Sequence, residues 1–156
     1  MMSRKKNGYL IFLVLALCGP SFRVAWGEYT EYYVSTATGS DATGEGTIAL
    51  PWASVNHALS SISPSEIEPA TVHVAAGIYR EYVTIRQFTE LAGGYDPNSW
   101  QRNPWVNETR VREIIAGVTT VIDGMAVRYP GTPGMLCTGS AQVSVVNCWI
   151  ADNRDL

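Results

Sequence analysis

Lysine is missing from this 156-residue chain after residue 6, and charged residues make up only 16% of it. All fourteen Asp and Glu residues, but only seven of the eleven Lys and Arg residues, lie in residues 28–156, which gives that part a net charge of −7. Such a surface repels phosphate backbones and argues against nucleic acid as a partner. An acidic polysaccharide would need a local arginine cluster or a bridging divalent cation to bind. A lysine base for catalysis is excluded within residues 28–156.

An apolar run long enough to span a bilayer is also lacking. The run Tyr9 to Cys18 is too short, because a spanning helix needs about 20 apolar residues. It follows three basic residues at 4–6, and Ala25 and Gly27 place small residues where a signal peptidase reads them. We therefore predict a signal peptide over residues 1–27, a secreted or cell-surface protein, and no stable membrane span after cleavage.

Two other interpretations of this segment stay open. Leu15-Ala16-Leu17-Cys18 resembles a bacterial lipobox with Cys18 as the lipidated residue, although Leu17 is bulkier than the usual Gly or Ala. An uncleaved membrane anchor is the other interpretation. Export is the expectation that we carry forward.

Cysteine is scarce, with three in the chain, and Cys18 leaves with the predicted signal peptide. Cys137 and Cys148 remain in a compartment that permits a disulfide. Their spacing does not decide whether they are bonded to each other or are two small buried thiols. Both interpretations stay open.

The chain from residue 28 to residue 156 fits one domain. Pro51 suits the first position of a helix, apolar residues follow it at helical spacing, and Ser63-Pro64 ends the pattern, which predicts an amphipathic helix over 51–62. Residues 96–113 are polar with two prolines and predict a long surface loop. Short alternating segments predict strands at Tyr32–Ser35, Thr71–Val74, Tyr82–Ile85, Glu90–Ala92, Thr119–Ile122, Met135–Cys137, Val143–Val146 and Cys148–Ile150.

Many strands with a single early helix indicate an all-β domain with a helical cap, and the pattern alone leaves a sandwich and a β-helix open. Several segments, in this order, carry a resemblance to one family. They are Tyr32–Ser35 with Gly39-Ser40-Asp41, Pro51–Leu59, Val72–Ile85, Gly93–Asp96, Thr120–Gly124 and Val145–Ile150. Together they resemble the N-terminal portion of secreted right-handed parallel β-helix proteins of the pectin-lyase-like superfamily.

The resemblance implies a right-handed parallel β-helix, a solenoid, over residues 28–156, with the helix at 51–62 capping its first coil. A solenoid needs several stacked repeats and a cap at each end, and no second cap is visible before Leu156. We therefore expect the solenoid to be truncated at its C-terminal end, so that this chain is the N-terminal piece of a longer polypeptide.

The family includes polysaccharide lyases, which use an Arg or Lys base with Ca²⁺, and hydrolases, which use paired carboxylates. Those sites usually lie on middle coils, beyond the part that this chain covers. We therefore expect no catalytic residues here and a role in binding glycans or surfaces, with a polysaccharide or cell-surface glycan as partner. The alternative is the N-terminal part of a pectate-lyase-like lyase or glycoside hydrolase, so whether the whole protein is an enzyme stays open.

Candidate substrate-binding residues are Trp100, Trp105, Arg110 and Arg112, because exposed tryptophans stack on sugars and arginines bind uronate carboxylates. The competing interpretation is that the tryptophans anchor the 96–113 loop.

No metal site is predicted, because His57 and His73 lack companions at ligand spacing. Asp41 and Glu45 offer oxygen ligands to Ca²⁺, but without the spacing of a calcium loop. We therefore expect no cofactor, with calcium as the alternative. Asp123 begins an Asp-Gly turn, where a carboxylate satisfies local backbone groups.

Overall fold

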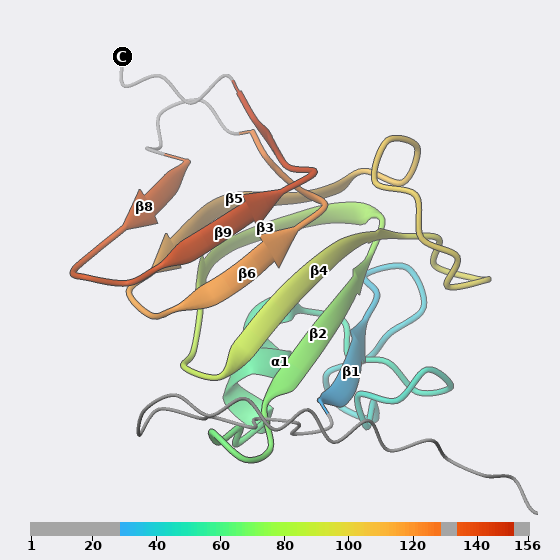
Figure 1. Ribbon diagram of the computed structural model, residues 1–156. Coiled ribbons are helices and arrows are strands. Elements are labelled where there is room, and N and C mark those ends of the chain that lie inside the picture. The colour runs from blue at the N-terminus through green and yellow to red at the C-terminus, as the bar shows by residue number, and fades with distance from the viewer. Residues whose placement is uncertain (1–28, 129–133, 152–156) are drawn as a thin grey trace, which may run out of the picture.

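The structure is a computed structural model that describes residues 29–128 and 134–151 (Figure 1). The predicted signal peptide, with Cys18 and the cleavage site, lies outside the described residues. Within them the chain forms ten strands and one helix. That helix, α1 (Val55–Ser61), has seven residues, so no described helix is long and apolar enough to cross a bilayer.

The strands form two parallel sheets, and the chain passes back and forth between them (Figure 1). The first sheet has the order β1 (Thr30–Val34), β2 (Ala70–Ala75), β4 (Thr89–Tyr95), β6 (Thr120–Asp123) and β9 (Val143–Val146). The second sheet has the order β3 (Gly77–Thr84), β5 (Thr109–Ala116), β7 (Met125–Val127) and β10 (Trp149–Ile150), and β8 (Met135–Cys137) also pairs with β5.

Inward-facing side chains of both sheets form one hydrophobic core. In the first sheet Val72 pairs with Leu91, which pairs with Ile122, and all three are fully buried. Each such side chain contributes about 1.5–3 kcal/mol when it leaves water. The period-2 alternation of the sequence therefore decides which side chains enter the core and which face solvent.

The prediction of a right-handed parallel β-helix is wrong. The described residues form two parallel sheets rather than a closed solenoid, and β8 pairs with β5 off the main path of the second sheet. Strands in the second sheet also shorten along the sheet, from eight residues in β3 and β5 to two in β10. The motifs that suggested coils report parallel pairing and alternating burial, which stacked parallel sheets share.

The helix is shorter than predicted, because α1 begins at Val55 and not at Pro51. The Asp41 carboxylate accepts hydrogen bonds from the backbone N–H of Ala53 (2.8 Å) and of Ser54 (3.0 Å) and from the Ser54 hydroxyl (2.7 Å). These bonds hold the residues before α1 in an extended conformation, and Trp52 instead bridges to Val34. Ser54 then serves as the N-cap of α1.

Two side chains, Glu81 from β3 and Arg86 just after it, bond to the two ends of α1. The Glu81 carboxylate accepts hydrogen bonds from the N–H groups of Val55 (3.1 Å) and Asn56 (2.7 Å), at the positive end of the helix dipole. Arg86 donates to the carbonyl oxygens of Leu59 (2.9 Å) and Ile62 (3.3 Å) at the other end. The helix is thereby fixed against β1, β2 and β3.

The segment 96–113 is a loop only as far as residue 108, because Thr109 begins β5. The polar composition hid this strand, in which Thr109 and Val111 are buried while Arg110 and Arg112 alternate outward. The loop itself is tied to the first sheet, since Arg102 donates to the Gly93 carbonyl oxygen at 2.9 Å.

Candidate functional site

The outer face of the second sheet carries a row of arginines across three adjacent strands. Tyr79, Val111 and Val127 are paired partners on β3, β5 and β7, and all three are buried. The next residue in each strand or just after it is an arginine that lies on the solvent side. The three arginines therefore come from three neighbouring strands, although a bulge between Tyr79 and Tyr82 shifts the register of β3 against β5 beside Arg80. With Arg110 on the same face of β5, we call this set the arginine face: Arg80, Arg110, Arg112 and Arg128.

One carboxylate, Glu108, bridges two members of the arginine face. Its Oε1 lies 2.8 Å from Nε of Arg110 and 3.8 Å from Nη1 of Arg128. The hydrogen bond from Arg110 lowers the pKa of Glu108, so this carboxylate stays ionised at neutral pH. Four arginines thus gather on one face, although residues 28–156 together carry a net charge of −7.

Two guanidinium groups of the face, those of Arg112 and Arg128, lie over aromatic rings. Arg112 donates to the Tyr82 hydroxyl at 3.2 Å, and its guanidinium carbon lies 5.1 Å from the centre of the Tyr82 ring. The guanidinium carbon of Arg128 lies 4.6 Å from the centre of the Trp149 ring. These cation–π contacts orient the two guanidinium groups against the face.

A small pocket of about 180 Å³ lies beside the arginine face. Trp105 from the 96–108 loop and Trp149 from β10 both line it, and their exposed fractions are 80% and 58%. Glu108 and Asn147 contribute polar groups to the same wall. Two exposed tryptophans on one pocket provide flat apolar surfaces on which a sugar ring can stack. We call this the tryptophan pocket.

The structure places the four predicted binding residues in two different regions. Trp105 lines the tryptophan pocket, whose wall includes Glu108, the ion-pair partner of Arg110, and Arg112 lies on the same strand as Arg110. Trp100 is elsewhere: it is half-buried over the first sheet, where its ring makes an edge contact with Tyr33 at 4.9 Å. For Trp100 the anchoring interpretation therefore describes the observed contacts, and for Trp105 it does not.

Sequence reasoning missed Arg80, Arg128 and Trp149. Each sits in or next to a short alternating segment, but which segments become neighbours depends on strand register. Trp149 joins the face because it pairs with Ala126, two residues before Arg128. A prediction of the pairing register between strands would have identified these three residues, whereas no sequence motif marks them.

The cysteines are free thiols in the structure. Cys148 packs against the core, its Sγ 3.1 Å from the Val146 carbonyl oxygen, and burial raises the pKa of its thiol. Cys137 is exposed on β8. Of the two interpretations, the buried-thiol one describes Cys148 and not Cys137.

Among residues 29–128 and 134–151, no group of three or more His, Cys, Asp or Glu side chains could hold a metal ion. The oxygens of Asp41 are engaged with Ala53 and Ser54, and calcium binding by Asp41 and Glu45 stays a prediction. Asp123 pairs with Arg102 at 2.7 Å and accepts a hydrogen bond from Asn147 at 2.9 Å, so it links the loop to the first sheet.

His73 lies in an aromatic cluster on the outer face of the first sheet. Its Nδ1 is 2.7 Å from the Tyr95 hydroxyl, and its ring stacks on Tyr33 at 5.0 Å. Burial lowers the pKa of His73, and Glu31, 3.7 Å from Nε2, opposes that shift. Only 12% of the His73 side chain is exposed, so this cluster offers little access to a substrate.

Comparison with known proteins gives no further guide: no family model, no curated protein and no solved structure matches the chain. The resemblance to the pectin-lyase-like superfamily therefore stays a prediction. The functional proposal therefore rests on the chemistry of the arginine face and the tryptophan pocket.

Proposed function

We propose that this chain is an exported binding protein for an anionic glycan, and that the glycan lies across the arginine face with a sugar ring in the tryptophan pocket. The observation that carries the proposal is the row of Arg80, Arg112 and Arg128 on adjacent strands beside two exposed tryptophans. Export rests on the sequence pattern of residues 1–27.

Stability alone does not explain such a row. Arginines gathered on one face of a sheet repel one another, and this repulsion lowers the stability of the fold. Exposed tryptophans such as Trp105 likewise gain little from folding, since most of the ring stays in water. An anionic ligand offsets both the repulsion and the exposure, because it neutralises the arginines and covers the tryptophan rings.

The arginines suit carboxylate or sulfate groups. A guanidinium group offers a planar fork of N–H donors that matches two oxygens of one anion. A linear glycan with one acid group per sugar would present such groups to successive strands. The contacts described here orient a ligand and include no residue that we assign to bond cleavage.

Isothermal titration of the purified protein with hexagalacturonate and with a sulfated heparin hexasaccharide tests the proposal and distinguishes the two acid groups. We expect one or both to bind, with affinity falling as salt rises. Arg128→Gln should weaken binding roughly ten- to hundredfold, the contribution of a charge-assisted hydrogen bond.

Arg86→Gln is the charge-matched control, because it removes one positive charge at the end of α1, where Arg86 bonds to Leu59 and Ile62. It should leave affinity unchanged once its thermal unfolding shows that the protein is folded at the titration temperature. Absence of binding to both hexasaccharides, or equal loss in the two variants, would overturn the proposal.

A further inference from the structure

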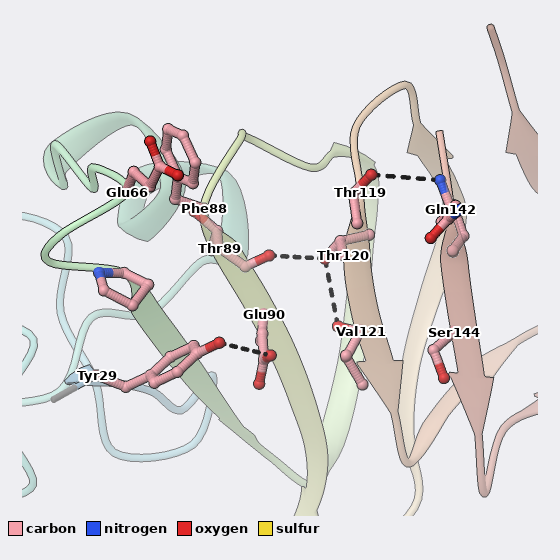
Figure 2. A pocket seen from close by; sticks show the side chains of 12 residues that line it. Tyr29, Glu66, Phe88, Thr89, Glu90, Thr119, Thr120, Val121, Gln142 and Ser144 are labelled. Atoms are coloured by element: carbon pink, nitrogen blue, oxygen red, sulfur yellow. Dashed lines mark hydrogen bonds between the residues drawn. The ribbon is translucent and has the colours of Figure 1, made fainter. Parts of the chain in front are cut away.

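A cleft of about 660 Å³ lies on the first sheet (Figure 2). Its lining comes from the beginnings of β4, β6 and β9 and from the residues just before β1 and β2. It therefore crosses the first sheet from strand to strand. The lining includes Tyr29, Phe88, Glu90, Thr119, Gln142 and Ser144.

The floor of this cleft repeats with the strands. Val121 on β6 pairs with Ser144 on β9, and Glu90 on β4 directly precedes Leu91, which pairs with Ile122. One outward side chain from each strand thus faces the cleft at intervals of roughly 4.8 Å. A floor with this repeat suits an extended, chain-like ligand that runs across the strands.

The polar groups of the cleft are hydroxyls, an amide and carboxylates. The Tyr29 hydroxyl donates to Glu90 Oε1 at 3.1 Å, and Thr119 Oγ1 accepts from the backbone N–H of Gln142 at 3.4 Å (Figure 2). Among the described residues that line the cleft there is no Arg, Lys or His, whereas Glu90 contributes a carboxylate. The Glu90 carboxylate repels an anionic ligand and can accept hydrogen bonds from the hydroxyl groups of an uncharged one.

Two aromatic rings lie toward the β1–β2 end of the cleft (Figure 2). Tyr29 is 43% exposed. Phe88 has a φ of 60°, a left-handed conformation that is costly for a bulky residue. Strain of this kind concentrates at binding sites, and here it sets a ring at the rim directly before β4.

We propose that this cleft is a second binding site, for an uncharged linear glycan. Aromatic rings stack on the apolar faces of sugars, and the hydroxyl, amide and carboxylate groups satisfy sugar hydroxyls. A peptide suits the cleft less well, because peptides that add to a sheet bind backbone groups at its edge. The middle of this cleft lies over β4 and β6, whose backbones are paired on both sides. The proposal does not depend on the arginine face.

Titration of the purified protein with cellohexaose, xylohexaose and mannohexaose tests it. We expect at least one to bind, with an affinity that changes little with salt because no charged group of the ligand takes part. Tyr29→Ala should weaken that binding roughly five- to tenfold through loss of stacking. Ser144→Arg, at an exposed position, should abolish it by filling the floor.

Ser60→Arg is the matched control, on the exposed side of α1, and should bind as the unchanged protein does. Trp105→Ala should also leave the uncharged ligand bound, while Tyr29→Ala should leave hexagalacturonate bound, so the two sites fail separately. The inference is overturned if none of the three uncharged hexasaccharides binds, or if Ser144→Arg and Ser60→Arg bind them equally.

Discussion

Arg128 and Trp149 stack on each other although 20 positions in the sequence separate them, with the Arg128 guanidinium carbon 4.6 Å from the ring centre. They meet because β10 pairs with β7, which brings Trp149 opposite Ala126. Trp149 remains 58% exposed in this contact. The pair therefore places a cation and a flat apolar surface side by side in water, which is a binding arrangement more than a packing one.

Trp149→Ala should therefore lower the free energy of unfolding by no more than about 1 kcal/mol, the size of an exposed cation–π contact. Trp52→Ala should cost about 3–5 kcal/mol, because Trp52 is buried in the core. Urea denaturation of both variants measures the two values. A larger loss for Trp149→Ala than for Trp52→Ala would show that Trp149 serves stability.

The side chains at the two ends of α1 give a second prediction. Glu81→Ala removes the acceptor of two backbone N–H groups, and Arg86→Ala removes the donor to two carbonyl oxygens. Each change should lower the free energy of unfolding by about 1–2 kcal/mol. Thr84→Ala, an exposed position between them on β3, is the control. Equal stability of all three variants would contradict the role assigned to these ends.

Gly93 lies where β4 comes close to the turn before β7. A substitution there tests how tightly the two segments are packed. A Cβ at Gly93 would lie 2.6 Å from the Gly124 carbonyl oxygen and 2.7 Å from the Met125 sulfur. Gly93→Ala should therefore destabilise the protein by about 1–3 kcal/mol through overpacking. Gly117→Ala, where a Cβ would meet one side-chain oxygen at 3.0 Å, should be much milder, and thermal unfolding compares them.

His73 predicts a dependence of stability on pH. Burial holds the pKa of His73 below its ordinary value of 6.5, so the unfolded chain takes up a proton at a higher pH than the folded one. The stability that neutral His73 provides is therefore full above pH 6.5 and is lost as pH falls through the folded pKa. His73→Gln should flatten this part of the stability curve, measured by urea denaturation from pH 7.5 downward. An unchanged slope would contradict the assignment.

Local pattern predicted strands that overlap β1 to β4, β6 and β8 to β10, because alternation marks a half-buried strand, and it missed β5 and β7. The prediction was wrong where residues distant in the sequence determine the local conformation. The start of α1 moved to Val55 because Asp41 binds Ala53 and Ser54, and nothing near Pro51 signals that contact. The parallel β-helix failed because its motifs report pairing and burial, not closure of a coil.

The candidate site was predicted in part for the same reason. Arg110 and Arg112 stood out as cations near tryptophans in a polar stretch. Their neighbours Arg80 and Arg128 come from other strands, and only the register of β3, β5 and β7 places them in one row. A single sequence contains the alternation of each strand but not the pairing between strands.

Nuclear magnetic resonance of the tryptophan indole N–H groups during titration with hexagalacturonate, repeated with the heparin hexasaccharide, tests the central claim most directly. We predict that the signals of Trp105 and Trp149 shift together with one or both ligands. The Trp52 signal should stay fixed, because its indole N–H is bonded to the Gly44 carbonyl oxygen at 3.0 Å in the core. Unchanged Trp105 and Trp149 signals at saturating concentrations of both ligands would contradict anionic glycan binding at this face.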